Sequence, residues 1–255
     1  MDGRLRAAAH EWRVTVDDSI ETPSSIIAFG RQHGAPVALK IVRNRGDEWR
    51  SGEVIHAFGA RGVVRVLAYM DGAMLLERIN PGRQLVELTR RGSDVEATEI
   101  IGDVIAAMSP TVPPAWCPHA ADWGRAFDWY RERGTSEIPP HVVDTAAAAY
   151  DELCATQGPT RLLHGDLHHY NVLEDEGRGW LAIDPKGVVA EAEFEIGAML
   201  RNPVESPALY GDPDVTSRRI AHLAIRLGLD ADRVRRWSFA QGVLSEIWKI
   251  QDAVL

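Results

Sequence analysis

Residues with the chemistry of phosphoryl transfer are concentrated between residues 161 and 185. Asp166 follows a short apolar run, Asn171 comes five residues later, and Asp184 follows a further apolar run. The turn-rich segment at residues 174–179 predicts a hairpin that returns Asp184 toward Asn171. One carboxylate can orient a hydroxyl nucleophile, while the amide and the other carboxylate can hold magnesium on the phosphates of a nucleotide. The stretch therefore predicts a phosphoryl-transfer site.

Other interpretations of this stretch exist. A His-Gly-Asp sequence, such as residues 164–166, is also typical of a tight turn with a capping aspartate. The histidines of the loop, His164, His168 and His169, could instead bind a transition metal. However, adjacent histidines do not converge easily, and the nearby carboxylates suit a hard cation better. The acids and the amide together favour a magnesium-dependent reaction.

The composition is that of an ordinary globular protein. The 255 residues suffice for one large domain or two lobes, with 45% hydrophobic and 25% charged residues. No uninterrupted apolar run approaches the length of a membrane span, and the N-terminus lacks the apolar segment of a secretory signal. Cys117 and Cys154 are too few for a disulfide framework or a zinc site, so we expect reduced thiols and a cytoplasmic location.

The net charge of −9 bears on the partners of the protein. A nucleic-acid-binding surface would need clustered basic residues, so we expect neither nucleic acid nor a membrane as a partner. The acidity could attract a cationic second substrate, but it is also an ordinary charge for solubility. Both a monomer and a homodimer are compatible with the sequence.

Hydrophobic periodicity divides the chain into a β-rich and a helical part. Hairpins are predicted over residues 26–42 and 63–77, with one helix over residues 47–58 between them. These patterns predict an α+β protein, in which a small antiparallel sheet with one helix precedes a mainly helical part. The later apolar spacing predicts helices over residues 93–105, 122–133, 141–156, 193–200, 217–227 and 231–252.

The motifs around the catalytic-looking loop resemble those of a known family. Residues 164–173, His-Gly-Asp-Leu-His-His-Tyr-Asn-Val-Leu, and residues 180–185, Trp-Leu-Ala-Ile-Asp-Pro, look like the catalytic loop and metal-binding turn of the aminoglycoside phosphotransferases. The resemblance covers about residues 12–250. The pattern is more narrowly similar to the streptomycin 6-phosphotransferase and hydroxyurea phosphotransferase group through Gly187, Glu191, Phe194, Asn202 and Pro203.

The resemblance implies a bilobal, protein-kinase-like fold. Residues 1–77 would form a nucleotide-binding N-terminal lobe, residues 78–82 a hinge, and residues 83–255 a C-terminal lobe with the catalytic loop, the metal-binding turn and the acceptor-binding helices. It also implies ATP as the phosphoryl donor and Mg²⁺ as the cofactor.

The resemblance gives a role to a lysine in the first β-rich segment. Lys40 lies inside a predicted strand between apolar neighbours, where position alone favours a side chain that reaches solvent. In the family such a lysine grips the α- and β-phosphates of ATP and pairs with a helix glutamate. Glu48 is our choice for this partner, and Glu53 is the alternative.

The resemblance also implies the other residues that contact the nucleotide and the metal ion. Asp166 becomes the catalytic base, Asn171 and Asp184 become magnesium ligands, and His168 lies where it could touch the γ-phosphate. The nucleotide loop would use the hydroxyl and backbone groups of Ser24 and Ser25. Adenine would bind the backbone of the hinge at Glu77, Arg78 and Ile79.

Departures from protein kinases point to a small-molecule substrate. Residues 22–25, Thr-Pro-Ser-Ser, lack the glycines of the protein-kinase nucleotide loop. After the metal aspartate the chain has Pro185-Lys186-Gly187 in place of Phe-Gly, and no activation segment that ends in Ala-Pro-Glu is present.

The acceptor side is less defined. Glu191, Glu193 and Glu195 follow the metal-binding turn and could pair with cationic groups of an aminocyclitol. They could equally be a solvated first helical turn, where acids favour the helix dipole. Most tryptophans are expected in the core, with one or two at the cleft.

These inferences predict a kinase that transfers the γ-phosphoryl group of ATP to a hydroxyl group of a small, cationic molecule. The leading acceptor is a streptomycin-type aminoglycoside, which the added negative charge would inactivate. Hydroxyurea, another antibiotic or a small metabolite is the first alternative. A catalytically silent nucleotide-binding protein is the second, which the full set of Lys40, Asp166, Asn171 and Asp184 disfavours.

Overall fold

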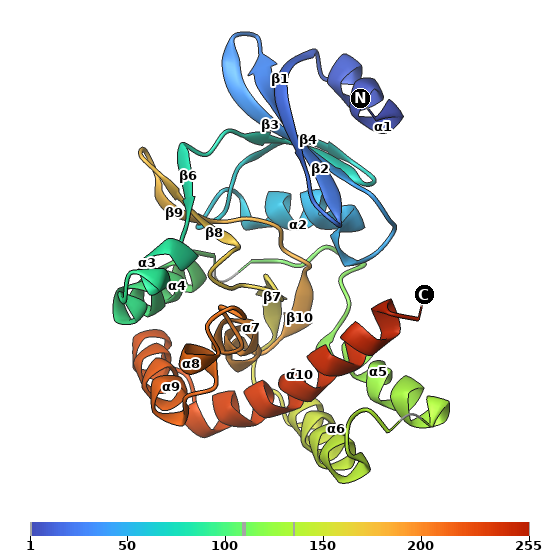
Figure 1. Ribbon diagram of the computed structural model, residues 1–255, viewed down its shortest axis with the longest axis vertical. Helices are drawn as coiled ribbons and strands as arrows, with labels where there is room; N and C mark the ends of the chain where they lie inside the picture. The colour runs from blue at the N-terminus through green and yellow to red at the C-terminus, as the bar shows by residue number, and fades with distance from the viewer. Residues whose placement is uncertain (1, 109–110, 135, 255) are drawn as a thin grey trace.

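The N-terminal lobe is built on a five-stranded antiparallel sheet with the order β1-β2-β3-β5-β4 (Figure 1). The computed structural model describes residues 2–108, 111–134 and 136–254. β2 and β3 are joined by a two-residue turn in which His33 and Gly34 have φ angles of 49° and 84°. This turn matches the twist of the strands and sets the register, in which Ile27 pairs with Lys40. The strands are β1 (Val14–Glu21), β2 (Ser25–Gln32), β3 (Ala35–Val42), β4 (Val66–Met70) and β5 (Ala73–Glu77).

A helix that the sequence pattern does not predict precedes the sheet. α1 (Gly3–Glu11) begins after Asp2, whose carboxylate accepts the first free N–H groups of the helix. Leu5, Ala8 and Ala9 form its buried face, and they belong to the same apolar cluster as the sheet residues. The pattern is weak because two of these three residues are alanines. The N-terminal lobe therefore has one more helix than predicted.

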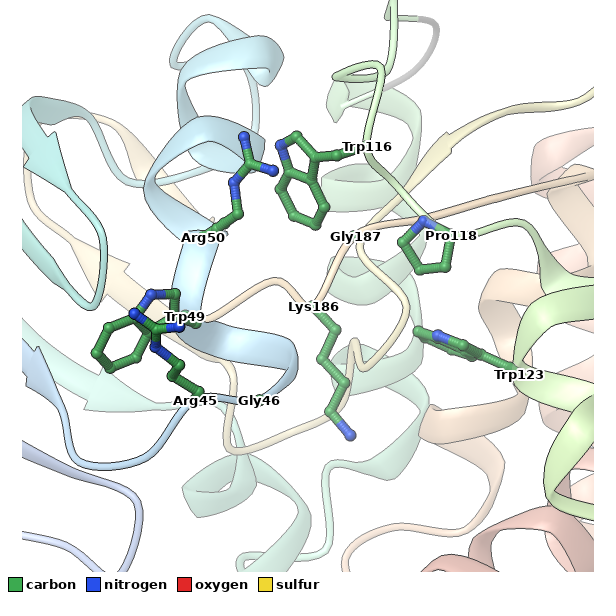
Figure 2. A pocket seen from close by; sticks show the side chains of 9 residues that line it. All are labelled: Arg45, Gly46, Trp49, Arg50, Trp116, Pro118, Trp123, Lys186 and Gly187. Carbon is green, nitrogen blue, oxygen red and sulfur yellow. The ribbon is translucent and has the colours of Figure 1, made fainter. Parts of the chain in front are cut away.

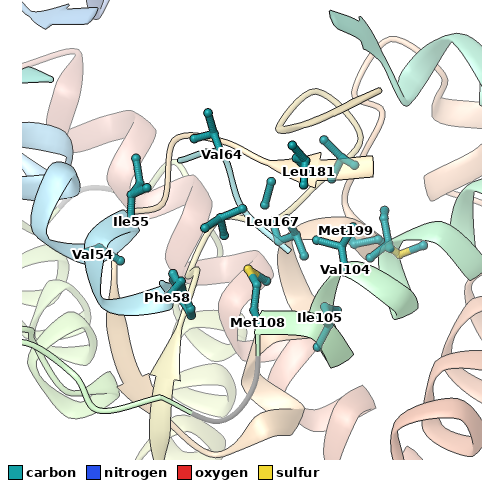
Figure 3. Close-up of a cluster of buried hydrophobic side chains, with 14 of the residues drawn as sticks. Val54, Ile55, Phe58, Val64, Val104, Ile105, Met108, Leu167, Leu181 and Met199 are labelled. Atoms are coloured by element: carbon teal, nitrogen blue, oxygen red, sulfur yellow. The ribbon is translucent and has the colours of Figure 1, made fainter. Parts of the chain in front are cut away.

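A shared apolar core joins α2 to the C-terminal lobe. The helix predicted over residues 47–58 consists of a 3₁₀ turn, η1 (Asp47–Arg50), and α2 (Ser51–Phe58), which ends at Gly59 in the left-handed conformation. In Figure 3, side chains of α2 and α4 (Asp94–Met108) lie in one cluster with residues beside the catalytic loop. Burial of this cluster fixes α2 relative to that loop. Its members include Val54, Ile55, Phe58, Val104, Ile105, Met108, Leu167 and Leu181.

The C-terminal lobe is mainly helical, as predicted, and has two small sheets. One has the strand order β6-β8-β9, and the other pairs β7 with β10. α10 packs against α5, α6, α7 and α9, and none of the described helices is long and apolar enough to cross a membrane. The strands are β6 (Pro81–Gln84), β7 (Arg161–Leu163), β8 (Val172–Asp175), β9 (Gly179–Ala182) and β10 (Val188–Ala190). Besides α4, the helices are α3 (Val86–Arg90), α5 (Ala120–Arg133), α6 (Pro140–Ala155), η2 (Ala192–Glu195), α7 (Ile196–Leu200), α8 (Pro207–Tyr210), α9 (Pro213–Leu227) and α10 (Ala231–Asp252).

The chain passes between the lobes just after Glu77, where β5 ends. The next strand, β6, already pairs with β8 of the C-terminal lobe. Glu77 accepts the backbone N–H of Arg65 at 2.7 Å and contacts the guanidinium group of Arg178. Arg178 Nη2 also donates to the carbonyl oxygen of Val63 at 3.1 Å. The β8–β9 turn is thereby tied to the N-terminal lobe beside the crossing point.

A buried ion pair joins α4 to α9. Arg219 is 1% exposed, and its Nη2 lies 2.5 Å from Oδ1 of Asp94. Arg219 Nη1 donates to the carbonyl oxygen of Asn202 at 2.8 Å, so the guanidinium group is well supplied with acceptors. Burial would raise the pKa of Asp94, but the hydrogen bonds and charge of Arg219 lower it below its usual value.

We expect Asp94→Ala to lower the free energy of unfolding by about 3–5 kcal/mol, because it leaves a buried guanidinium unpaired. Urea denaturation at neutral pH measures this loss. Asp103→Ala is the matched control, since it removes an exposed pair with Arg226 between the same two helices and should cost less than about 1 kcal/mol. Because the native pKa of Asp94 is lowered, its contribution is present above pH about 4 and is lost as the pH falls further. Equal losses in the two variants would contradict this account.

Candidate active site

A cavity of about 410 Å³ lies between the lobes beside the hinge. Its walls are mostly apolar, and Lys40 and Asp184 are among the residues that line it. The hinge residues Glu77, Arg78 and Ile79 line it as well. An apolar cavity with a few charged groups suits a nucleotide, whose base is flat and whose phosphates are charged.

Lys40 is the charged centre of this cavity. Its side chain is 3% exposed, and Nζ lies 2.6 Å from Oε2 of Glu48 and 2.8 Å from Oδ1 of Asp184. Burial acts to lower the pKa of Lys40, but the two carboxylates outweigh it and raise the pKa above its usual value. Glu53, the alternative partner, instead binds Arg50 at 2.7 Å and accepts the indole N–H of Trp116 at 2.7 Å. The structure thus pairs Lys40 with Glu48.

His164 holds the backbone of the catalytic loop. Its ring is fully buried, and burial lowers its pKa to about 4, so it is neutral at physiological pH. Nε2 lies 2.8 Å from the carbonyl oxygen of Ile183, so Nε2 carries the proton and Nδ1 accepts the N–H of Asp166 at 3.2 Å. One neutral imidazole therefore connects the residue before Asp184 to Asp166.

Asp166 follows β7 in the catalytic loop, and its side chain is 32% exposed. Burial acts to raise its pKa, but the charge of Lys186, with smaller effects from His168 and other neighbours, lowers it below the usual value. Lys186 Nζ lies 3.6 Å from Oδ2 of Asp166, and His168 Nε2 lies 3.8 Å from Oδ1. An ionised carboxylate in this position can accept a proton from a hydroxyl group.

Asn171 and Asp184 are brought together by the β8–β9 hairpin, in which Ile183 N donates to Asn171 O at 2.9 Å. Asn171 Nδ2 donates to the backbone oxygen of Asp166 at 3.0 Å, which leaves its Oδ1 for a cation. Asp184 has a φ angle of 58°, a left-handed conformation that aspartate tolerates better than most residues. An amide and a carboxylate oxygen are donors that Mg²⁺ accepts, with phosphate oxygens and water for the remaining positions. The donor set fits this cation.

His169 points away from the site. It is fully buried, both ring nitrogens lack a hydrogen-bond partner in the described protein, and burial next to Arg219 lowers its pKa to about 3. Within the described ranges, no three His, Cys, Asp or Glu side chains form a group that could hold a metal ion. These contacts give no support to the transition-metal interpretation of the loop histidines.

Glu195 accepts hydrogen bonds from the backbone of the catalytic loop and is not available to an acceptor. Its Oε2 accepts the N–H of His164 at 2.7 Å, and its Oε1 accepts the N–H of Gly165 at 3.1 Å. Its side chain is buried, and this burial raises the pKa to about 7 despite the two hydrogen bonds. The predicted acceptor role of Glu195 is therefore wrong, because both of its oxygens are used inside the lobe.

Glu191 is also internal. It is 3% exposed and accepts hydrogen bonds from Arg233 and Trp237 of α10, each at 2.5 Å. The prediction that Glu191 binds the acceptor is wrong for the same reason. Glu193 is partly exposed and accepts the N–H of Asp230 at 3.2 Å, at the start of α10. The alternating acids of the sequence thus anchor helices and the catalytic loop.

The loop between β1 and β2 is closed by its own side chains. Ser25 is 2% exposed, and its hydroxyl lies 2.9 Å from that of Thr22. The Ser25 side chain is therefore not free for a nucleotide, which contradicts the prediction for this residue. Ser24 is exposed next to it, and its carbonyl oxygen accepts the N–H of Arg43 at 2.8 Å.

A second hollow, of about 300 Å³, is lined by residues of both lobes (Figure 2). Lys186 and Gly187, which follow Asp184, form part of its lining, and their N–H groups both bind the carbonyl oxygen of His164 at 3.0 Å. The sequence gives no acceptor role to Lys186, although it marks Pro-Lys-Gly as a departure from protein kinases. The hollow adjoins the candidate base because Lys186 contacts Asp166.

We expect His169→Leu to reduce the acid sensitivity of the fold. In the wild type, the unfolded chain binds a proton at His169 between pH about 6.5 and pH about 3, and the native state does not. His169 therefore lowers the free energy of unfolding as the pH falls through that window. Leucine binds no proton, so it has no such effect. The variant should gain in unfolding free energy relative to the wild type as the pH falls from about 7 to about 5. Urea denaturation of both proteins at several pH values measures this difference. Glu195 has the opposite pH dependence, but it is present in both proteins, so its contribution cancels. A difference in unfolding free energy that is constant with pH would contradict the prediction.

Residues 11–253 match a family model described as aminoglycoside/hydroxyurea antibiotic resistance kinase. The chain is 31% identical over 246 residues to a streptomycin 3''-kinase of Klebsiella pneumoniae, which covers 94% of this chain and 90% of that protein. It is 32% identical over 271 residues to a hydroxyurea phosphotransferase of Kitasatospora aureofaciens, with 99% and 74% covered. A streptomycin 6-kinase of Streptomyces griseus is 27% identical, with 95% and 81% covered.

Solved structures share the fold at low sequence identity. Choline kinase LicA from Streptococcus pneumoniae has a TM-score of 0.65 and 12% identity, with 99% of this chain and 92% of that chain covered. Aminoglycoside phosphotransferase APH(4)-Ia, in a complex with ADP and hygromycin B, has a TM-score of 0.57 and 17% identity, with 95% and 96% covered. These likenesses establish the kinase-like fold. Since the family match extends over nearly all of the chain, the protein belongs to the aminoglycoside/hydroxyurea antibiotic resistance kinases, ATP-dependent phosphotransferases that act on hydroxyl groups.

Proposed function

We propose that this kinase phosphorylates a hydroxyl group of a streptomycin-type aminoglycoside, with ATP as donor and Mg²⁺ as cofactor. The observation that carries the proposal is the convergence of Lys40, Glu48 and Asp184 at the nucleotide cavity, while His164 links the residue before Asp184 to the backbone of Asp166. The relatives named streptomycin kinases support the choice of acceptor. Phosphorylation would inactivate such a drug by placing negative charge on a hydroxyl group that otherwise donates hydrogen bonds.

Hydroxyurea is a second candidate acceptor. One relative is named a hydroxyurea phosphotransferase, and the described lining of the hollow next to Asp166 includes Arg45, Arg50 and Lys186. The described lining contains no carboxylate for the cationic groups of streptomycin, whereas hydroxyurea is uncharged and needs none. The acceptor panel described below separates the two candidates.

In the proposed mechanism, the residues position the reactants and Asp166 moves the proton. Lys40 holds the α- and β-phosphates, and Glu48 keeps its ammonium group in place. Asn171 and Asp184 would hold Mg²⁺, which neutralises phosphate oxygens when it is bound. The Asp184 carboxylate, which lies 2.8 Å from Lys40 Nζ, would then contact both the cation and the lysine.

The chemical step is an in-line displacement at the γ-phosphorus. The acceptor oxygen forms a bond to phosphorus, the bond to the bridging oxygen of ADP breaks, and ADP leaves with the electron pair. Asp166 accepts the hydroxyl proton and later releases it to solvent. We propose that His168, whose Nε2 lies 3.8 Å from Oδ1 of Asp166, donates to the transferred phosphoryl group. A His168→Ala variant that keeps full activity would remove His168 from the mechanism.

We expect the purified protein to transfer one phosphoryl group from ATP to streptomycin in the presence of Mg²⁺, as measured by mass spectrometry of the product. The panel also contains hydroxyurea, other aminoglycosides, choline and ethanolamine. Lys40→Ala should lower kcat by at least about 100-fold, because the phosphates lose a fixed charge, while circular dichroism shows an intact fold. Phosphorylation of hydroxyurea alone would replace the lead with the second candidate. ATP binding without turnover of any compound would contradict the proposal.

We expect Glu195→Gln to lower kcat about 10-fold or more and to leave the KM for ATP within about twofold. A glutamine can accept one backbone N–H through its oxygen, but its NH₂ group then faces the other N–H, so the catalytic loop loses an anchor. Glu193→Gln, two residues earlier in η2 and at a partly exposed position, is the matched control and should keep wild-type kinetics. A Glu193→Gln variant that loses acceptor affinity would instead support the acceptor role that the sequence predicts for Glu193.

A further inference from the structure

Arg4, in the first turn of α1, holds together three segments of the N-terminal lobe. Its Nη1 donates to the carbonyl oxygen of Val42 at 2.5 Å, and its Nη2 donates to that of Gly72 at 2.9 Å. The same guanidinium group lies over the indole of Trp49, with Cζ 4.8 Å from the ring centroid. One side chain of α1 therefore joins the end of β3, the β4–β5 turn and η1.

These contacts lie beside the pair formed by Lys40 and Glu48. β3 carries Lys40 and ends at Val42, and η1 carries Glu48 directly before Trp49. A short loop joins the two elements. Arg4 thus binds both ends of this loop, and the flanking elements contribute the ammonium and carboxylate groups that lie 2.6 Å apart.

η1 depends on its surroundings, because its own structure is weak. It is a single 3₁₀ turn of four residues, and its N-cap residue is Gly46, which has no side chain to accept a free N–H group. A turn of this length is not stable by itself in water. The carbonyl oxygen of Trp49 accepts the N–H of Gly72 at 2.8 Å, and the Ser51 hydroxyl donates to that of Glu48 at 2.7 Å. The position of the Glu48 carboxylate therefore depends on how firmly Trp49 is held.

The indole ring of Trp49 is contacted by two cationic side chains. Its Nε1 is buried and has no hydrogen-bond partner within the described residues. Arg45 lies 5.5 Å from the ring centroid (Figure 2), but it belongs to the loop that leads into η1. A Cβ atom added to Gly72 would overlap both Arg4 Nη2 and Trp49 Cζ3, so these two groups close over the turn. Arg4 therefore ties the indole to the sheet through the carbonyl oxygens of Val42 and Gly72.

α1 presents this guanidinium group from a fixed position. Leu5, Ala8 and Ala9 bury the helix against the sheet, and Asp2 accepts the N–H groups of Arg4 and Leu5. The residues that the family model matches begin at the last residue of this helix. The family match therefore assigns no role to Arg4.

We propose that Arg4 is a positioning residue for nucleotide binding, which acts through η1 to hold Glu48 against Lys40. A guanidinium group suits this role, because its planar fork can donate to two carbonyl oxygens while its face lies on an indole. With Glu48 in place, the ammonium group of Lys40 is fixed between two carboxylates. A displaced Glu48 leaves that ammonium group to Asp184, which then has to serve the lysine and a cation without help. This inference rests on the nucleotide role proposed for Lys40.

The first test removes the guanidinium group and keeps most of the alkyl chain. In the full-length protein, Arg4→Met should raise the dissociation constant of ADP about fivefold or more, because the charged donors at the two carbonyls and the indole are lost. Calorimetry in the presence of Mg²⁺ measures this constant. Arg6→Met is the matched control, since Arg6 is exposed on the same helix and takes no part in these contacts, and it should stay within about 1.5-fold of the wild type. Wild-type ADP affinity in Arg4→Met would overturn the inference.

A double-mutant cycle distinguishes positioning from general stabilisation. Glu48→Gln alone should weaken ADP binding, and Arg4→Met added to it should change the dissociation constant by less than about twofold, because Arg4 acts through Glu48. Effects that multiply would place the action of Arg4 elsewhere and contradict the inference.

Hydrogen exchange provides a readout without a ligand. Arg4→Met should raise the amide exchange of η1 and leave that of α5, in the other lobe, unchanged. Unchanged exchange in η1, or a uniform rise over both lobes, would contradict a local positioning role.

These measurements need no acceptor, so they separate the inference from the proposed function. If no compound is phosphorylated but the Arg4 and Glu48 variants bind ADP as expected, the proposed function fails and the positioning role stands. If streptomycin is phosphorylated but Arg4→Met binds ADP like the wild type, the proposed function stands and the inference fails. A wild-type protein that does not bind ADP, or a Lys40→Ala variant that binds it normally, would overturn both.

Discussion

A buried lysine that needs negative partners organises this protein. Lys40 lies in the middle of a sheet strand, and its charge is stable there because Glu48 and Asp184 are within 2.8 Å. Glu48 belongs to the N-terminal lobe and Asp184 to the turn after β9, so one ammonium group sets the distance between the lobes at the nucleotide cavity. The apolar cluster below α2 supports the same arrangement without charge.

The catalytic loop depends on a different kind of constraint, which is the satisfaction of buried polar groups. His164 can donate to Ile183 and accept from Asp166 only while it is neutral, and its burial keeps it neutral. Glu195 then accepts the N–H groups of His164 and Gly165 from the opposite side. Unpaired, each of these groups would cost free energy in the interior. The position of Asp166 is therefore determined by its neighbours more than by its own side chain.

The sequence predicts the site best where a motif and a local hairpin coincide. Asp166, Asn171 and Asp184 lie close in the chain, and the β8–β9 hairpin that joins them has clear turn signals. Local patterns do not reveal which groups a side chain meets across the fold. Glu191 and Glu195 look like surface acids in the sequence, yet helix α10 and the loop at His164 cover them. The Ser25 hydroxyl is predicted to contact the nucleotide, but it instead forms a hydrogen bond with the Thr22 hydroxyl. α1 is missed because two of its three buried residues are alanines.

Net charge is a poor guide to the acceptor, because charge acts locally. The chain carries −9 overall, yet the described lining of the hollow beside Asp166 includes two arginines and a lysine. At physiological salt, exposed charges more than about 8 Å away are largely screened, so the acidic surface has little influence inside the cleft. A reacting hydroxyl group must also approach a carboxylate that Lys186 keeps ionised. Because Lys186 lies 3.6 Å from this carboxylate, the state of the base depends on a contact made two residues after Asp184.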